Sequence, residues 1–429
     1  MNATDNSTVQ LKKGFRGYFN AVFGSVPLLA WFVGMLVSVI LESHVGYDLA
    51  DAIGLPKAPV LFGFLIMLKK PALIPSTLLY VVLIYALPIG IVAKLLSALA
   101  NRLAAALLRL PMLLAVLVYL ALLYAVLAIW ADISAYRLLT LKLTLIAVMV
   151  TLSLNVINGY MGEFSCSHPG FMALGAYAAS AFTLTLFAND HLFGKALLSS
   201  HLGLWLFPVG LIGGGLVAAV GALVVAIPSF KTRGDYLAII SLAFMFIVKS
   251  LIENLEVVGG PRGMSSQPNY AGLLTVFIWT VLCVWTINNF VRSIPGKALN
   301  AVRDDEMAAE SMTVNTRRTK MTAFMFSAFW AGVAGGLFAH VIRFVNPATF
   351  GIQKLAEVLA MVYFGGLNSV YGSIVGAVSL NMLGEMLRPL EIFKWIIIPL
   401  LLILVMIYRP TGLVAFKEFD VKRLIQPKK

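Results

Sequence analysis

Residues 204–227 read LWLFPVGLIGGGLVAAVGALVVAI, a run without a single charged side chain. An α-helix rises about 1.5 Å per residue, so a run of this length crosses the hydrocarbon core of a bilayer, which is about 30 Å thick. The whole chain of 429 residues has this character, since 60% of its residues are hydrophobic and only 12% are charged. Too little polar surface remains to cover a water-soluble globule. The composition therefore predicts an all-α polytopic membrane protein.

Similar apolar runs recur along the chain, and they predict about ten to twelve membrane-crossing helices. One further stretch, Glu357–Leu387, is interrupted at Gly365, Gly366, Asn368 and Gly372, so we expect it to form two short spans or a re-entrant pair. The uninterrupted runs are Phe19–Leu41, Ala72–Ala93, Pro111–Trp130, Leu141–Ile157, Phe171–Ala188, Leu204–Ile227, Tyr236–Leu251, Ala271–Phe290, Met321–Val341 and Phe393–Tyr408.

The basic residues behind the net charge of +13 lie in short loops beside the apolar runs. Lys and Arg concentrate in cytoplasmic loops, so this pattern indicates membrane orientation and not a nucleic-acid partner. We expect a cytoplasmic N-terminus, a large cytoplasmic loop at residues 292–320 and a cytoplasmic C-terminal tail. Lys69 and Lys70 are exceptions, because the same path through the membrane leaves them outside.

Glycine becomes frequent within the apolar runs after about residue 140. We therefore expect an N-terminal extension at residues 1–139 with about three transmembrane helices, a core domain at 140–416 and a tail at 417–429. Small residues four positions apart let helices approach closely in lipid. Such spacing, which predicts a compact bundle, occurs at Gly210, Gly214 and Ala218, at Ala328, Gly332 and Gly336, and at Gly372 and Gly376.

Polar and helix-breaking residues interrupt the apolar pattern at Asn155–Tyr177. Irregular backbone at membrane depth persists only where protein buries it or where it lines a wet cavity. The stretch is therefore either a short interfacial loop or a broken segment that lines a path. Phe364–Gly372 is either a loop between two half-helices or a further part of the path. Ionisable residues within a membrane are usually functional, so Glu163 and Glu357 are candidates. Glu357 could face the bundle interior. The candidate path residues are Asn155, Asn158, Gly159, Gly162, Glu163, His168, Glu357, Gly365, Gly366 and Asn368.

Two shorter stretches carry turn or cap signals. In Lys231–Asp235, KTRGD, the last residue stands where a helix N-cap is expected, and Arg233, Gly234 and Asp235 either hold the cytoplasmic face or contact a partner subunit. In Val258–Met264, VGGPRGM, the residues Gly259, Gly260, Pro261 and Gly263 predict a tight turn on the outer face, which could also receive a delivery protein.

The charged island Ser293–Lys320, SIPGKALNAVRDDEMAAESMTVNTRRTK, is the place where a soluble partner could dock. Asp304, Asp305 and Glu306 favour the start of a helix, because carboxylates complement the N-terminal dipole. Asn315 is expected as a left-handed stop. Leu299, Val302, Ala309 and Met312 recur at roughly helical spacing and suggest an apolar face. The chain has no GxxxxGK[ST] phosphate loop, so an ATP-driven step needs a separate subunit and no cofactor is expected here.

These stretches, in this order, resemble the LivM-type permeases of branched-chain amino acid ABC importers. The similarity covers about residues 140–416 and is carried by an ordered set of motifs. The motifs are Gly159-Tyr160-x-Gly162, His168, Gly175-Ala176-Tyr177, Arg233-Gly234-Asp235-Tyr236-Leu237-Ala238-Ile239, Gly259-Gly260-Pro261-x-Gly263, Gly296-x-Ala298, Ala301-x-Arg303-Asp304-Asp305-Glu306-x-Ala308-Ala309, Asn346-Pro347 and Gly365-Gly366-Leu367-x-Ser369.

The resemblance implies a non-enzymatic, multi-pass subunit of the bacterial inner membrane that translocates branched-chain or other small amino acids. It implies a homologous second permease, two cytoplasmic ATPase subunits that use the ATP, and a periplasmic substrate-binding protein. Residues 296–315 would form the segment that sits in an ATPase groove. The coupling residues implied are Gly296, Ala298, Ala301, Arg303, Asp304, Asp305, Glu306, Ala308, Ala309 and Glu310.

The sequence departs from the family pattern at Glu163, Phe164, Cys166, Arg262 and Asn368, which leaves the cargo open. An additional carboxylate could favour a cationic or amide-bearing ligand, and urea permeases of the same superfamily share a similar framework. An ion-coupled secondary transporter is a further alternative, because such proteins pair broken helices with ionisable residues. A membrane enzyme ranks last, because the aspartates at positions 304 and 305 have no second aspartate-rich motif.

Overall fold

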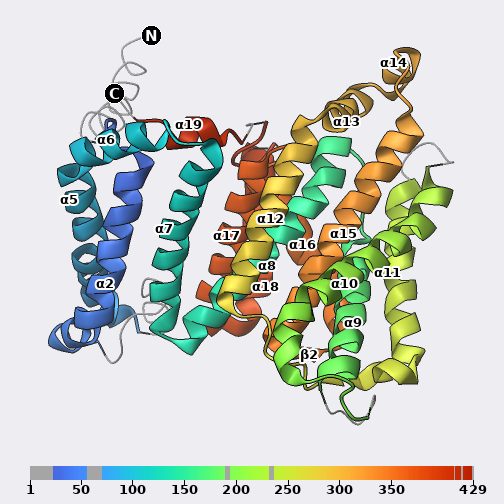
Figure 1. The fold of residues 1–429 in the computed structure, drawn as a ribbon, viewed down its shortest axis with the longest axis horizontal. Coiled ribbons are helices and arrows are strands. Elements are labelled where there is room, and N and C mark those ends of the chain that lie inside the picture. The colour runs from blue at the N-terminus through green and yellow to red at the C-terminus, as the bar shows by residue number, and fades with distance from the viewer. Residues whose placement is uncertain are drawn as a thin grey trace. The chain divides into compact units, whose positions relative to one another are not determined.

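The computed structural model describes residues 23–55, 70–188, 194–230, 236–409, 411–416 and 419–427. These residues are helical almost throughout, and the strands among them are very short (Figure 1). Within the described ranges, nine helices are long and apolar enough to cross a membrane, and the apolar helix Ile396–Tyr408 is shorter. The predicted all-α polytopic membrane fold is confirmed.

The chain divides into two compact units, Met1–Leu138 together with Asp420–Lys429, and Leu139–Phe419. In the order of the chain, the helices of the first unit are α2 (Leu28–Ala52), η2 (Pro71–Leu73), α4 (Ile74–Val81), the π-helical turn η3 (Val82–Ala86), α5 (Leu87–Leu95), α6 (Ser97–Leu107), α7 (Met112–Asp132) and the short terminal α19 (Val421–Ile425).

A buried ion pair lies inside the first unit and explains why α2 differs from its prediction. The run Phe19–Leu41 was expected to end before Glu42, yet α2 continues to Ala52. The Glu42 carboxylate, 1% exposed, accepts hydrogen bonds from Arg137 Nη2 at 2.7 Å and from the Tyr85 hydroxyl at 2.5 Å. Arg137 neutralises the charge of the carboxylate and the Tyr85 hydroxyl adds a hydrogen bond, so the helix can carry Glu42 among apolar neighbours.

The second unit, here called the core unit, holds most of the described helices. They are α8 (Ala135–Asn155), the π-helical turn η4 (Val156–Met161), α9 (His168–Phe187), α10 (Ser200–Ser229), α11 (Tyr236–Asn254), η5 (Glu256–Val258), η6 (Gly260–Arg262), α12 (Leu273–Arg292), α13 (Ile294–Asp304), α14 (Glu306–Ser311), α15 (Thr316–Ile342), η7 (Pro347–Phe350), α16 (Ile352–Gly365), α17 (Val370–Met386), η8 (Arg388–Phe393) and α18 (Lys394–Tyr408). The strands β1 (Met264–Ser265) and β2 (Phe344–Val345) pair antiparallel.

Close contacts between α9, α10 and α15 form the centre of the core unit. A Cβ atom on Gly175 of α9 would overlap the Gly332 carbonyl of α15, and one on Gly332 would come within 2.6 Å of the Ala218 side chain of α10. A Cβ on Gly214 would likewise lie 2.7 Å from the Gly175 carbonyl oxygen. Only glycine permits backbones to approach this closely, so the predicted role of the small residues in helix packing is confirmed here.

The interrupted stretch 357–387 forms two helices joined by a short turn. α16 has 14 residues and α17 has 17, so each is shorter than any of the nine candidate membrane spans in the described ranges, the shortest of which has 19 residues. The two pack tightly, because a Cβ on Gly376 would overlap the Met361 carbonyl. The predicted division of this stretch into two short helices is confirmed, and whether they form two spans or a re-entrant pair stays a prediction. Within the core unit, α13 and α14 lie at one end and β2 lies at the other (Figure 1).

Candidate coupling and translocation site

The charged island folds as two short helices followed by the start of a long one. α13 ends at Asp304, and Asp305 is the N-cap of α14, where its carboxylate accepts a hydrogen bond from the Ala308 amide at 3.0 Å. Asn315 was predicted to be a left-handed stop, and this is wrong. It has φ −75° and caps α15 by accepting from the Arg318 amide at 2.9 Å, while Thr313, with φ 68°, is the left-handed residue. An asparagine cap satisfies an orphan amide at the start of a long helix, and this use outweighs its preference for the left-handed region.

α13 and α14 present part of their apolar residues to the outside. Leu299, Val302 and Ala309 are buried as expected, but Met312 is 77% exposed and Met307 is 73% exposed. Ile294 is 86% exposed as well, and the exposed acidic residues Asp304, Asp305, Glu306 and Glu310 lie on or between the same two helices, a mixture that suits contact with a soluble partner. The exposed predicted coupling residues are Ala301, Asp304, Asp305, Glu306, Ala308 and Glu310, while Gly296 and Ala309 are buried and Ala298 and Arg303 are half-buried.

An ion triad joins this surface to the interrupted stretch that follows α8. Lys320, at the start of α15, donates to Glu306 of α14 at 2.8 Å and to Glu163 at 2.7 Å. The Lys320 side chain is 10% exposed, against 26% for Glu163 and 45% for Glu306. Charge-assisted hydrogen bonds of this length are strong where solvent is largely excluded. The triad therefore holds α14, α15 and the segment after η4 together.

Arg303 makes a second connection between α13 and η4. Its Nη1 donates to the Gly159 carbonyl at 3.4 Å, and its Nη2 pairs with Asp304 at 2.7 Å. Gly162, with φ 77°, lies under the aliphatic part of Arg303, and a Cβ there would overlap the Arg303 Cγ. This close approach requires a bare backbone in the left-handed region, which glycine supplies.

The buried amide of Asn155 joins α8 to the turn between α16 and α17. Its Nδ2 donates to the Ser369 carbonyl at 3.1 Å and to the Ser373 hydroxyl at 2.6 Å, and its Oδ1 accepts from the Asn368 amide at 3.2 Å. Gly159 faces the same place, since a Cβ on it would overlap Asn155 and would lie 2.5 Å from the Asn368 backbone nitrogen. The structure thus brings together the two interrupted stretches, which lie more than 200 residues apart in the chain.

The second half of the segment between η4 and α9, residues 165–167, is buried by protein, whereas Phe164 is 44% exposed. Asn158 accepts from the Ser165 amide at 3.2 Å, and His168 Nε2 lies 3.1 Å from the Ser327 hydroxyl of α15. Cys166 packs beside Met245 and Leu355, and burial raises the pKa of its thiol above the usual range. Its thiol therefore stays protonated, and Cys166 packs as a small apolar residue.

The two acidic path candidates lie elsewhere than expected. Glu357 does not face the bundle interior, because α16 buries the face that carries Leu355 and Val358 and leaves Glu357 exposed, paired with Lys354 at 3.0 Å. Glu163 is ion-paired beside α14 rather than isolated at membrane depth. The two carboxylates therefore do not form the inward-facing pair that a secondary transporter would use.

The remaining candidates have simple surroundings. Gly259, Gly260 and Gly263 all have positive φ, and Gly260 accepts a bond from the Gly263 amide at 3.1 Å, so Val258–Met264 forms the tight turn that was expected. Gly365 and Gly366 are buried beside α17 and residue 414. Arg233, Gly234 and Asp235 lie outside the described residues.

Sequence reasoning missed the pairing partner of Glu163 and the partners of Asn155. Lys320 directly precedes an apolar run, a position where a lysine usually serves only to hold a helix at the membrane interface. No periodicity connects it to Glu163, which is 157 residues away in the chain. Ser369 and Ser373 follow the Gly365-Gly366 motif closely in the sequence. This proximity was the one feature that could have pointed to them as partners of Asn155.

Comparison with known proteins agrees with this architecture. Residues 136–407 match the family model of the permease component of the branched-chain amino acid transport system. The chain is 33% identical over 316 residues to the high-affinity branched-chain amino acid transport system permease protein LivM of Escherichia coli (strain K12), covering 65% of this chain and 70% of that protein. LivM of Salmonella typhimurium gives the same identity and coverage.

A more distant relative has a different cargo in its name. The autoinducer 2 import system permease protein LsrC of Enterobacter sp. is 26% identical over 153 residues, which cover 34% of this chain and 43% of LsrC. No solved structure matches the chain significantly. The relatives are transport permeases, as predicted, and not enzymes. Because the matched region spans most of the core unit and its contacts, the chain belongs to the family of branched-chain amino acid transport system permease components.

Proposed function

We propose that this chain is one of two permease subunits of an ATP-driven importer of branched-chain amino acids in the bacterial inner membrane. The names of the similar permeases from Escherichia coli and Salmonella typhimurium support this cargo. A homologous second permease, two cytoplasmic ATPase subunits and a periplasmic binding protein complete the importer. The end of the core unit with α13 and α14 faces the cytoplasm, and Val258–Met264 faces the periplasm and receives the binding protein.

The Glu163–Lys320–Glu306 triad is the observation that carries the coupling part of the proposal. Glu306 lies on the exposed surface of α14, and Glu163 lies at the end of η4, so one lysine connects the docking surface to an interrupted membrane segment. Arg303 supplies a parallel connection from α13 to Gly159. A displacement of α13 and α14 by an ATPase subunit therefore reaches η4 and the residues after it through two separate sets of side-chain contacts.

From η4 the displacement continues to the turn between α16 and α17. Asn155, one residue before η4, is bonded to Asn368 and Ser369 of that turn. These neutral bonds are buried, so no water competes for them. We propose that the two interrupted stretches border the path and that ATP-driven motion of α14 changes their separation from the rest of the bundle.

Purification of the complex tests the assembly directly. The tagged chain, extracted from its own membranes in mild detergent, is expected to retain a second permease and an ATPase in fixed stoichiometry. In proteoliposomes this complex should accumulate labelled leucine only with ATP and the binding protein. A chain that purifies alone and still moves solute in liposomes would overturn the importer assignment and favour a secondary transporter.

A matched pair of variants tests the coupling role. Glu306→Arg replaces the carboxylate that lies 2.8 Å from Lys320 Nζ with a positive charge. The repulsion should break the triad, so uptake should be abolished while ATP hydrolysis continues. Asp51→Arg makes the same charge change on an exposed residue of α2, away from the docking surface, and retains the triad. If uptake is lost in both variants or normal in both, the contact between residue 306 and Lys320 does not couple ATP hydrolysis to uptake.

A further inference from the structure

After α18 the chain returns to the turn between α16 and α17 and lies against it. The Leu413 amide donates to the Phe364 carbonyl at 3.1 Å, and the Val414 amide donates to the Gly365 carbonyl at 2.8 Å. Both carbonyls belong to the last turn of α16, where they have no partner within their own helix. The segment after α18 therefore completes the hydrogen bonding at the end of α16.

The contact between this segment and the turn is close, because glycines lie on both sides of it. Gly412 has φ 89°, and a Cβ on it would come within 2.5 Å of the Gly366 Cα. A Cβ on Gly372, in the first turn of α17, would come within 2.6 Å of the Val414 carbonyl oxygen. Backbone packs on backbone here, and only glycine permits such an approach. The attachment to the turn therefore does not depend on the rotamer of any side chain.

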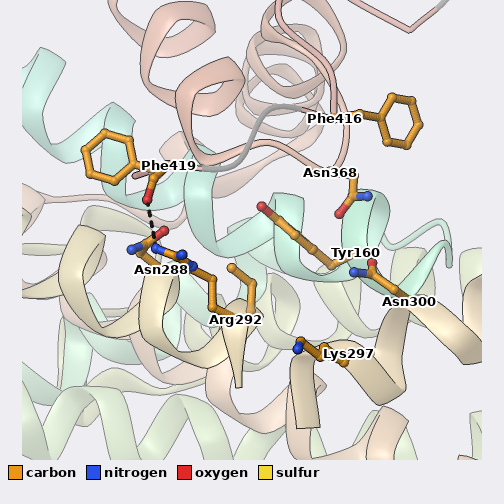
Figure 2. A pocket seen from close by; sticks show the side chains of 9 residues that line it. Tyr160, Asn288, Arg292, Lys297, Asn300, Asn368, Phe416 and Phe419 are labelled. Atoms are coloured by element: carbon orange, nitrogen blue, oxygen red, sulfur yellow. Dashed lines mark hydrogen bonds between the residues drawn. The ribbon is translucent and has the colours of Figure 1, made fainter. Parts of the chain in front are cut away.

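The same segment also contacts α12 and α13. We call residues 412–416 together with Phe419 the strap. The guanidinium carbon of Arg303, on α13, lies 5.8 Å from the centre of the Phe416 ring. Arg292, on α12, donates to the Phe419 carbonyl at 3.4 Å (Figure 2). The strap therefore connects the helix of the proposed docking surface to the turn between α16 and α17.

The strap borders a pocket of about 330 Å³ in the core unit. Lys297 of α13 and Asn368 of the turn both line this pocket, and Figure 2 shows Phe416 and Phe419 on opposite sides of it. The packing between α13 and the turn is thus interrupted at the pocket. The strap spans this interruption.

Phe416 has an unusual backbone conformation for its side chain. Its φ is 53°, in the left-handed region, which a bulky residue rarely adopts. Residues in such conformations persist where their surroundings hold them, and they cluster at functional sites. The side chain is 62% exposed, so burial in an apolar core does not hold it. Among the described residues its ring partner is the Arg303 guanidinium, which the face of an aromatic ring attracts.

We propose that the strap is a positioning element of the importer, which makes the turn between α16 and α17 follow α13, and that Phe416 is its connection to α13. This inference rests on the proposed function, in which an ATPase subunit displaces α13 and α14. Arg303 also donates to the Gly159 carbonyl at 3.4 Å. The same arginine thus acts on the turn by two routes, one through η4 and Asn155 and the other through Phe416 and the backbone of the strap.

The two ends of the strap respond differently to substitution. Its bonds to the turn use the backbone amides of Leu413 and Val414, which remain when a side chain is replaced. Its contact with Arg303 uses the Phe416 ring alone. A substitution at Phe416 therefore separates the strap from α13 and leaves it attached to the turn.

The amount of leucine transported per ATP hydrolysed, measured with the complete complex in proteoliposomes, tests this proposal. Phe416→Gly removes the ring and suits the left-handed backbone without strain, and Phe416→Leu keeps an apolar side chain but has no aromatic face. Both should lower the ratio about two- to fivefold, the loss expected for one exposed cation–π contact. Phe416→Trp keeps a ring over Arg303 and should restore the ratio.

Phe393→Leu is the matched control. Phe393, at the end of η8, is 63% exposed, and the structure shows no cation over its ring within the described residues. Its replacement should leave the leucine-to-ATP ratio unchanged.

Hydrogen exchange of the peptide containing Leu413 and Val414 reports the attachment to the turn without relying on transport. Slow exchange is expected in the parent complex and in the variants at Phe416. Fast exchange in the parent, an unchanged ratio in both Phe416→Gly and Phe416→Leu, or a Phe416→Trp complex as defective as Phe416→Leu would each overturn the role of the strap. ATP-driven leucine uptake by the parent in those cases leaves the importer proposal intact. A parent complex that accumulates no leucine with ATP would overturn the importer proposal itself, and the role of the strap with it.

Discussion

Replacing Asn155 with alanine should loosen the turn between α16 and α17. The variant removes bonds to the Ser369 carbonyl, the Ser373 hydroxyl and the Asn368 amide, at 3.1, 2.6 and 3.2 Å. Interhelical hydrogen bonds in membrane proteins average about 0.6 kcal/mol each and reach about 1.7 kcal/mol. Three such bonds give a destabilisation of about 2 kcal/mol, with an upper value of about 5 kcal/mol.

The assay is equilibrium unfolding in mixed detergent micelles, followed by tryptophan fluorescence. Thr286→Ala is the matched control, because Thr286 is on α12 and its hydroxyl bonds only to carbonyls of its own helix, at 2.8 and 3.1 Å. Its cost should stay below about 0.5 kcal/mol. A double-mutant cycle with Ser373→Ala then isolates the 2.6 Å bond, with an expected coupling of about 0.6 kcal/mol or more.

Two outcomes would refute this reasoning. If Asn155→Ala unfolds with the same free energy as the Thr286→Ala control, the buried amide does not stabilise the turn. If the cycle with Ser373 gives a coupling energy within about 0.3 kcal/mol of zero, the two side chains do not interact as described. A loss of stability together with normal leucine uptake would separate the structural role of Asn155 from its proposed place beside the path.

Three further variants test other contacts. Arg137→Met leaves Glu42 buried without its cation, so it should destabilise the chain by about 3–5 kcal/mol in the same unfolding assay, and the double variant with Glu42→Met should cost less than the single one. Glu163→Gln weakens one half-exposed ion pair worth about 1 kcal/mol, so leucine transported per ATP hydrolysed should fall about fivefold, and an unchanged ratio would contradict the triad mechanism. Glu357→Gln removes only an exposed pair, so uptake and stability should stay within error of the parent; lost uptake would restore Glu357 as a path residue.

The features that depend on local sequence patterns were predicted well from the sequence. Membrane helices follow from the length of an apolar run, and glycines four apart, as at Gly332 and Gly336, predict close packing, because both depend only on neighbours along one helix. The end of α2 was missed for the opposite reason. Whether a helix can continue through Glu42 depends on Arg137, which comes 95 residues later and which no local pattern connects to it.

The candidate site shows the same limit. The interrupted stretches containing Asn155 and Asn368 were identified as special, because polar and helix-breaking residues stand out in apolar sequence. Their contact with each other is tertiary and needed the structure. Glu357 was expected to face the bundle interior because it lies seven residues, or two helical turns, before Phe364. The neighbouring face, which carries Leu355 and Val358, is more apolar and is buried instead.

Glu163 is one of the positions where the sequence predicts a departure from the family pattern, and its surroundings bear on cargo. A free carboxylate beside the path would attract a cationic ligand and could change the amino acid carried. Here the Glu163 carboxylate is bonded to Lys320 at 2.7 Å, and Lys320 is shared with Glu306. A carboxylate already paired with a lysine offers little net attraction to a second cation, so the departure tunes the connection to α14 and leaves cargo selection to other groups. On this argument the Glu163→Gln variant changes the leucine-to-ATP ratio without changing the preference for leucine over arginine, and a variant that altered the preference alone would place Glu163 in the path after all.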